Sequence, residues 1–229
     1  MIGTGPGVAG SKSRWSDLRL RIASACVLAP LGLAALWLGG AAWLALVGAL
    51  TLGLGAEWVL LCRRLGRSAR LAAMLAGVPY VGLGAAALLW LRAGHGSGRL
   101  ALLFVVLVVW ASDIGAYAVG RLIGGPLLAP AISPGKTWAG AVGGLVAAAA
   151  VGFVSLHPGS ALLAAGLGIA AQAGDLMESA MKRGFGVKDS GWLIPGHGGL
   201  LDRFDGLLTA APAAAAAALL AGRAALGWG

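Results

Sequence analysis

The segment AGDLMESAMKRGFGVKDSGWLIPGHGGLLDRFD, residues 173–205, holds most of the acidic side chains of a chain that is otherwise almost entirely apolar. It contains five of the eight Asp and Glu residues, namely Asp175, Glu178, Asp189, Asp202 and Asp205. The 229 residues are 59% hydrophobic and 11% charged, whereas soluble domains carry about 25% charged residues. We therefore predict a membrane-spanning protein whose polar chemistry gathers in this one segment.

Apolar runs on both sides of this segment predict an all-α, polytopic fold. A helix needs about 20 apolar residues to cross a bilayer. Seven runs approach that length, at residues 22–39, 41–61, 71–91, 100–119, 138–156, 161–177 and 206–226. We expect about seven transmembrane helices, within a range of six to eight. The first two are separated only by Gly39 and Gly40, which predicts a tight hairpin.

The basic residues predict the orientation of these helices. With a cytoplasmic N-terminus, 14 of the 17 Lys and Arg residues fall on the inner side, and only Arg92, Arg99 and Arg223 fall on the outer side. This follows the positive-inside rule. We expect a disordered, basic, cytoplasmic N-terminus at residues 1–21, N-terminal membrane helices at 22–99 and a catalytic membrane region at 100–229. The net charge of +9 suits anionic lipid headgroups, and nothing indicates nucleic-acid binding.

The spacing within residues 173–205 predicts a phosphate-binding and metal-binding site. Asp175, Glu178 and Lys182 recur at helical spacing, so one face of a helix should present them. Asp202 and Asp205, three residues apart, should share a face of a second helix. Carboxylates from two segments suit Mg²⁺, and neighbouring Lys and Arg side chains suit a polyphosphate. The Gly- and Pro-rich connector between them allows close backbone approach to a ligand.

Two further acidic residues stand in apolar runs. Asp113 lies late in the span LLFVVLVVWASDIGAYAVG (residues 102–120). An ionisable group there is a functional candidate, although it could simply pair with a neighbouring helix. Glu57 precedes Trp58 at the inner end of the second span. It reads equally well as an interfacial anchor or as a carboxylate on the substrate side.

A second motif, Ser133-Pro134-Gly135-Lys136-Thr137, contains Gly-Lys-Thr but is not a P-loop. A P-loop requires a glycine five residues before Gly135, and Pro130 stands there. The motif is expected at the cytoplasmic start of a helix, where backbone N–H groups and Lys136 could bind a phosphate group.

Four short stretches together resemble the signature of the phosphatidate cytidylyltransferases, the CDP-diacylglycerol synthases. They are Ser-Ala-Met-Lys-Arg at 179–183, Lys-Asp-Ser-Gly at 188–191, Pro-Gly-His-Gly-Gly at 195–199 and Leu-Asp-Arg-Phe-Asp at 201–205. The segment around Asp113 and the Ser133–Thr137 motif are similar to other family motifs, except that Ala139 stands where the family usually has Glu. The resemblance implies that CTP and phosphatidate give CDP-diacylglycerol and diphosphate at a cytoplasmic site in the inner membrane.

The resemblance also implies roles for individual residues. Catalytic roles are expected for Lys136, Asp175, Lys182, Arg183 and Asp202. Substrate binding is expected for Asp113, Ser133, Lys136, Lys182, Arg183, Lys188, Asp189, His197 and Arg203. Metal ligands are expected from Asp175, Glu178, Asp202 and Asp205, which would hold Mg²⁺ with room for a second metal ion. Membrane lipids are further expected partners, and a homodimer is compatible with the resemblance.

Two other functions compete with this one. A CTP-dependent polyprenol or phytol kinase would share the nucleotide chemistry but would transfer the γ-phosphate to an alcohol. An ion-coupled transporter would use Asp113 and Asp175 as a cation site, but it should carry polar groups from the inner to the outer face. The acidic residues cluster toward one side only, which disfavours transport.

Overall fold

The protein is a bundle of apolar helices with one small β-hairpin. The computed structural model describes residues 26–94, 97–155, 159–191, 198–223 and 226–228. The predicted basic terminus at 1–21 and His197 lie outside these residues. The elements, after a helix at Cys26–Leu38, are α2 (Gly40–Cys62), α3 (Arg67–Arg92), α4 (Gly98–Ile123), β1 (Leu127–Ala129), β2 (Ser133–Thr137), α5 (Trp138–Val154), α6 (Ser160–Gly184) and α7 (Leu201–Ala221).

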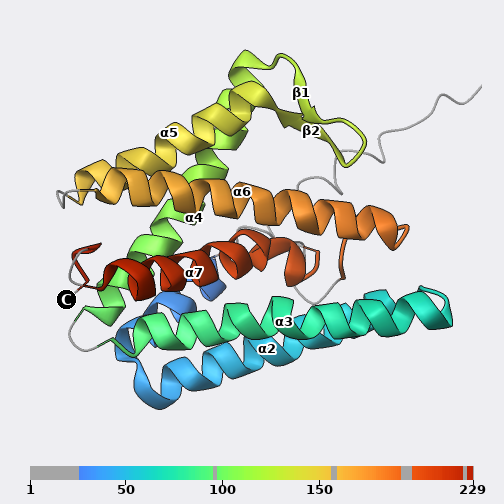
Figure 1. Cartoon of the computed structure of the whole chain (residues 1–229), viewed down its shortest axis with the longest axis horizontal. Coiled ribbons are helices and arrows are strands. Elements are labelled where there is room, and N and C mark those ends of the chain that lie inside the picture. The colour runs from blue at the N-terminus through green and yellow to red at the C-terminus, as the bar shows by residue number, and fades with distance from the viewer. Residues whose placement is uncertain (1–25, 95–96, 156–158, 192–197, 224–225, 229) are drawn as a thin grey trace, which may run out of the picture.

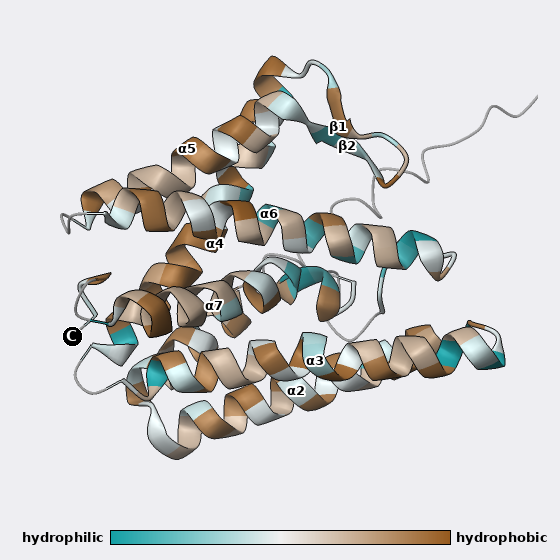
Figure 2. Cartoon of the chain, viewed as in Figure 1, coloured by the Kyte–Doolittle hydropathy of each residue, from teal (hydrophilic) through white to brown (hydrophobic). Residues whose placement is uncertain are grey.

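Each predicted span corresponds to one helix, and the protein is a helical membrane protein. Helices α2, α3, α4, α6 and α7 are long and apolar enough to cross a membrane, whereas Cys26–Leu38 and α5 are shorter. Apolar residues extend along the helices in Figure 2. The predicted tight connection is confirmed: Gly39 and Gly40 have φ values of 67° and 50°, which side-chain-bearing residues rarely adopt.

Within residues 173–205, the two helices extend further than the ends of the predicted apolar spans. Helix α6 continues to Gly184 rather than ending at residue 177, and α7 begins at Leu201 rather than at residue 206. The predicted Gly- and Pro-rich connector between the two helices therefore comprises residues 185–200, of which 192–197 lie outside the described residues. Hydropathy marks where the membrane ends, whereas the backbone hydrogen bonds of a helix continue beyond that border.

The Ser133–Thr137 motif leads directly into helix α5, as expected, and forms strand β2, which the sequence did not predict. It pairs antiparallel with β1, with Leu127 opposite Thr137. Pro134 and Gly135 both disfavour helix. Helix α5 begins directly afterwards, and the Thr137 side chain caps it by accepting a 3.0 Å hydrogen bond from the Gly140 N–H.

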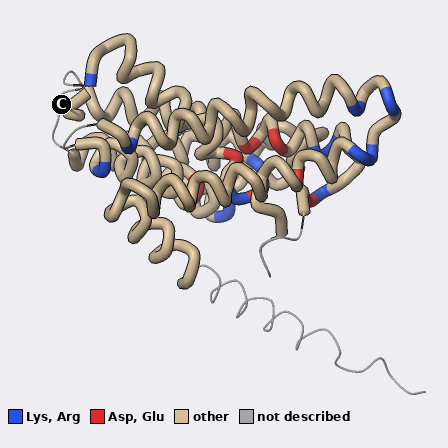
Figure 3. The backbone as a smooth tube through the Cα atoms, turned by 90° about the horizontal axis from the view of Figure 1, so that it is seen from below, with Lys and Arg blue, Asp and Glu red and all other residues tan. Residues whose placement is uncertain are grey.

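The helices form a row in which α5, α6, α7, α3 and α2 follow one another, and α4 crosses behind them (Figure 1). Helix α4 contacts α3, α5, α6 and α7, and Leu102, Val105 and Val108 on it are fully buried. The hairpin, the α2–α3 turn and the end of α6 lie at the same end of the bundle. Asp and Glu residues occur part-way along the length of the bundle, and Lys and Arg residues occur beside them and at both ends (Figure 3).

A polar contact joins three helices where glycine lets them approach closely. The Gln172 side chain on α6 donates to Ser112 Oγ on α4, at 3.2 Å, and to the Ala141 carbonyl on α5, at 3.1 Å. A Cβ atom added to Gly144 would lie 2.6 Å from Gln172 Nε2 and 2.7 Å from the Ser112 carbonyl oxygen. Small residues at such sites allow membrane helices to pack closely.

We predict that Gly144→Leu destabilises the bundle. Overpacking of a tight interface costs about 1–3 kcal/mol, so the thermal unfolding midpoint in detergent should fall by several degrees. Gly166→Leu is the matched control, because Gly166 on α6 has no neighbouring atom within 4 Å of an added Cβ. Equal midpoints for the two variants would contradict this account of the helix packing.

Candidate active site

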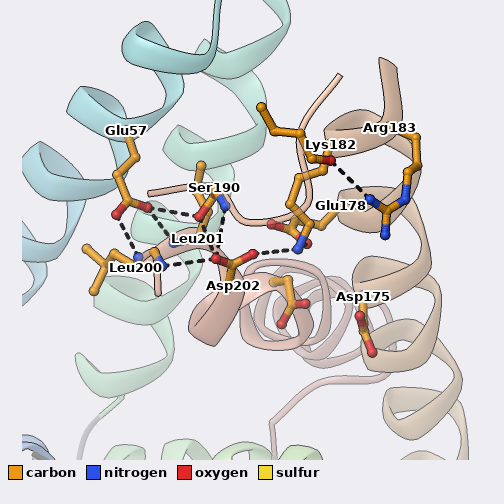
Figure 4. Close-up of polar contacts among 12 residues, drawn as sticks. Glu57, Asp175, Glu178, Lys182, Arg183, Ser190, Leu200, Leu201 and Asp202 are labelled. Atoms are coloured by element: carbon orange, nitrogen blue, oxygen red, sulfur yellow. Dashed lines mark hydrogen bonds and ion pairs between the residues drawn. The ribbon is translucent and has the colours of Figure 1, made fainter. Parts of the chain in front are cut away.

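One face of α6 carries the acidic and basic side chains, as the helical spacing predicted. Lys182 lies one turn beyond Glu178, and its Nζ is 2.5 Å from Glu178 Oε2. Lys182 Nζ also pairs with Asp202 Oδ1 on α7 (Figure 4). The side chains of Lys182, Glu178 and Asp202 are only 13%, 3% and 10% exposed. One ammonium group therefore neutralises two carboxylates from two helices in a largely buried position.

Asp202 also holds the connector. Its Oδ2 accepts hydrogen bonds from the Ser190 N–H and Oγ, both at 3.0 Å, and from the Gly199 N–H at 2.9 Å. Ser190 lies near the start of the connector and Gly199 near its end. A single carboxylate thus brings both ends of the connector to the first turn of α7.

The β-hairpin joins α6 through a second ion pair and through Arg183. Lys136 Nζ on β2 lies 2.6 Å from Asp175 Oδ2, with side chains 26% and 38% exposed. Arg183 donates to the carbonyl of Ile132, between the two strands, and to that of Val187, each at 3.1 Å. Both side chains are partly exposed, whereas the Lys136 Nζ atom itself is buried and, among the described residues, has no hydrogen-bond partner besides this ion pair.

Two more predicted carboxylates lie close to Asp175. Asp113 on α4, Asp175 on α6 and Asp205 on α7 interact electrostatically with one another. Lys136 and Arg203 lie close enough to Asp113 to offset part of this negative charge. The structure therefore brings together carboxylates from three helices and cations from the hairpin and α7.

Other predicted site residues occupy the edge of this region. Lys188 and Asp189 are exposed on the connector, and Ser133 is partly buried at the start of β2. His197 lies outside the described residues.

Glu57 lies buried against the signature segment, so it is not an interfacial anchor, the first of the two roles that its sequence context suggested. It is 1% exposed, and its oxygens accept hydrogen bonds from Leu200 N–H at 2.8 Å, Leu201 N–H at 2.9 Å and Ser190 Oγ at 3.2 Å. Figure 4 shows it reaching from α2 to the start of α7. Sequence reasoning missed this contact and the role of Ser190, although a lone carboxylate in an apolar span was the available signal.

The predicted metal ligands can be compared with the oxygen atoms that Mg²⁺ requires. Mg²⁺ usually takes one or two protein carboxylates and fills its remaining positions with water and phosphate oxygens. The partly exposed Asp175 carboxylate fits that requirement. Among the described residues, no group of three or more His, Cys, Asp or Glu side chains is arranged to hold a metal ion. A substrate phosphate would therefore have to complete such a site.

These features define a helical membrane protein that gathers alternating carboxylates and cations at one site, an arrangement suited to phosphate chemistry. Residues 62–221 match the model of the Cytidylyltransferase family. That match covers most of the chain and contains every predicted site residue. The chain belongs to the cytidylyltransferase family.

Individual relatives agree with this assignment. The chain is 50% identical over 143 residues to a Brucella suis protein named phosphatidate cytidylyltransferase. This alignment covers 59% of this chain and 53% of the relative. Proteins of the same name from Haemophilus influenzae and Staphylococcus haemolyticus are 45% identical over 127 residues and 44% identical over 146 residues. Those alignments cover 50% and 60% of this chain, and 44% and 55% of the relatives. The chain thus spans about half the length of the curated relatives it matches.

We predict that Lys182→Met strongly destabilises the protein, because it leaves Glu178 and Asp202 buried without their cation. Removing one partner of a buried ion pair costs about 3–5 kcal/mol. Thermal unfolding in detergent measures the change. Lys188→Met removes the same charge from an exposed position and should change stability by less than about 0.5 kcal/mol. Adding Glu178→Gln to Lys182→Met should restore part of the loss, and similar stabilities for the two single variants would contradict the assigned ion bridge.

Proposed function

We propose that this protein is a phosphatidate cytidylyltransferase, which converts CTP and phosphatidate to CDP-diacylglycerol and diphosphate in phospholipid biosynthesis. The observation that carries the proposal is the gathering of Lys136, Asp175, Lys182 and Asp202 from the hairpin and two helices of an apolar bundle. The names of its relatives support the choice of substrates. A membrane-embedded site suits a lipid substrate, and paired cations suit a nucleoside triphosphate.

In this reaction a phosphate oxygen of phosphatidate forms a bond to the α-phosphorus of CTP. The bond from that phosphorus to the oxygen bridging to the β-phosphate breaks, and diphosphate leaves with the bonding electrons. The protein has to bring two polyanions together and neutralise the charge on the leaving group. No nucleophilic side chain is required.

We assign phosphate binding to the basic side chains and positioning to the residues around them. Lys136 is best placed to bind a phosphate group, because its ammonium is buried beside the start of α5 and, among the described residues, has no hydrogen-bond partner besides its ion pair with Asp175. Lys182, Arg183, Lys188 and Arg203 add positive charge nearby, and Ser133 can contribute its hydroxyl group. Asp113, Asp189 and His197 complete the proposed substrate-binding set.

A magnesium ion, when bound, would neutralise and orient the phosphate oxygens. We propose Asp175 as its first ligand, because that carboxylate is partly exposed. Asp202 can contribute Oδ1, because its partner Lys182 is also held by Glu178. Asp205 and Glu178 are the remaining proposed ligands, and the number of metal ions stays open.

We further propose that the site faces the cytosol from the inner membrane, where CTP is present. The 14-to-3 distribution of basic residues supports this orientation. The hairpin, the α2–α3 turn and the end of α6 would then all be cytoplasmic, because they lie at one end of the bundle. The short helices Cys26–Leu38 and α5 would bring the number of membrane helices to seven.

We predict that the purified protein, given labelled CTP, phosphatidate and Mg²⁺, forms CDP-diacylglycerol and diphosphate. Chromatography of the products checks this, because a lipid kinase would instead release CDP and a transporter would form neither product. Asp175→Asn should lower turnover by at least about a hundredfold with an unchanged unfolding midpoint, because it removes a charge rather than a buried contact. Near-normal turnover by Asp175→Asn would remove this residue from the metal site.

We also predict the side of the membrane on which the site lies. Gly184→Cys, in a protein with Cys26 and Cys62 replaced by alanine, should react with an impermeant thiol reagent only from the cytosolic side. Gly184 is exposed and has no neighbouring atom within 4 Å of an added Cβ. Ser155→Cys at the opposite end of the bundle is the matched control and should react only from outside. The reverse pattern would overturn the proposed orientation.

A further inference from the structure

Glu57 lies in α2, before the start of the family match at residue 62, yet it contacts the segment that carries the family signature. Both of its carboxylate oxygens are used. Oε1 accepts from the Leu200 N–H, and Oε2 accepts from the Leu201 N–H and from Ser190 Oγ. Because the side chain is buried and bound by the protein's own donors, Glu57 is not placed to bind a substrate directly.

The contacts of Glu57 with the Leu200 and Leu201 N–H groups provide hydrogen-bond acceptors that the start of α7 lacks. The first N–H groups of a helix lack partners within the helix and need outside acceptors. Leu200 occupies the N-cap position of α7 and provides no side-chain hydrogen bond. Glu57 supplies the missing acceptors from α2, and a negative charge at a helix N-terminus is also electrostatically favourable. This contact therefore fixes the residue at which α7 begins. It also fixes the position of Asp202, which lies in the first turn of α7.

Ser190 connects Glu57 to Asp202. Its hydroxyl oxygen lies 3.2 Å from Glu57 Oε2 and 3.0 Å from Asp202 Oδ2. The Ser190 N–H also donates to Asp202. The single hydroxyl proton is shared between the two carboxylates, so both act on the same residue, and a shift of Glu57 would be felt at Asp202.

Glycines provide the space for this arrangement. A Cβ atom added to Gly191 would lie 2.5 Å from Glu57 Oε1, and one added to Gly199 would lie 1.8 Å from Ser190 Oγ, 2.7 Å from the Gly191 nitrogen and 2.9 Å from Glu57 Oε2. Any larger residue at either position would push the connector away from Glu57. This explains two glycines of the signature by packing around Glu57, without reference to a ligand.

We propose that Glu57 is a positioning residue for the cytidylyltransferase reaction, holding both ends of the connector and the start of α7 so that Asp202 stays in place. This inference rests on the proposed function for its catalytic consequence. Its structural part, the protection of the connector ends by Glu57, stands independently. The N-terminal helices thus act on the site as well as anchoring the protein.

Glu57→Gln tests the proposal at constant side-chain size. Glutamine has a single acceptor oxygen, and its NH₂ group would face a backbone N–H that needs an acceptor. We expect the kcat to fall by at least about tenfold, since displacing a catalytic group by about 1 Å can cost about a hundredfold. Hydrogen–deuterium exchange should become faster in peptides covering residues 186–191 and 198–204 and stay unchanged in α4 and α5.

Trp43→Phe is the matched control from the same helix. It removes the hydrogen bond from Trp43 Nε1 to the Leu88 carbonyl, which joins α2 to α3 without touching the connector. It should leave the kcat within about twofold of wild type and the connector exchange unchanged. A similar loss of kcat in both variants would show that Glu57 acts only through the general packing of α2, and it would overturn the proposal.

The two measurements on Glu57→Gln separate the alternatives. Faster exchange with an unchanged kcat would make Glu57 a structural cap only, and a lower kcat with unchanged exchange would place its effect elsewhere; either result overturns the proposal. Ser190→Ala removes only the shared hydroxyl group and should lower the kcat less than Glu57→Gln does. A larger loss for Ser190→Ala would transfer the positioning role to the hydroxyl.

Exchange in the wild-type protein covers the case in which Glu57→Gln fails to fold. The Leu200 and Leu201 amides should exchange as slowly as amides within α7, and exchange as fast as that of residues 186–189 would overturn the proposal. If the wild-type protein forms no CDP-diacylglycerol, the proposed function fails. The exchange measurement still decides whether Glu57 holds the connector.

Discussion

The ammonium group of Lys182 lies between Glu178 and Asp202, and the arrangement of the site depends on this contact. Two carboxylates this close and this buried would repel each other without a cation between them. The ion bridge fixes the end of α6 against the start of α7. Asp202 can then use its second oxygen to hold Ser190 and Gly199.

The buried and the accessible charges serve different purposes. Glu57, Glu178 and Lys182 are nearly enclosed, and Glu57 acts on the site through the position of the residues that it binds. Lys136 and Asp175 are partly exposed and pair across the hairpin and α6. Under the proposed function, a substrate phosphate would compete with the Asp175 carboxylate for the Lys136 ammonium.

The β-hairpin and Glu57 show where sequence reasoning reached its limit. The sequence placed the Ser133–Thr137 motif directly before a helix, but the pairing of β2 with β1 depends on residues on both sides of a reversal. The contact from Glu57 to Leu200 joins residues 143 positions apart. No local pattern encodes such a distance, and only the packing of α2 and α3 against α7 brings these residues together.

The sequence by itself determined the helical membrane architecture, the polar face of α6 and the family of the protein. Hydropathy and helical spacing are local properties, and the family signature is a linear pattern. Tertiary structure alone decided which charges meet. It paired Lys136 with Asp175, placed Lys182 between Glu178 and Asp202, and turned Glu57 into a cap for α7. The physical reason is that a buried charge in a low-dielectric interior takes whatever partner the helix packing places beside it.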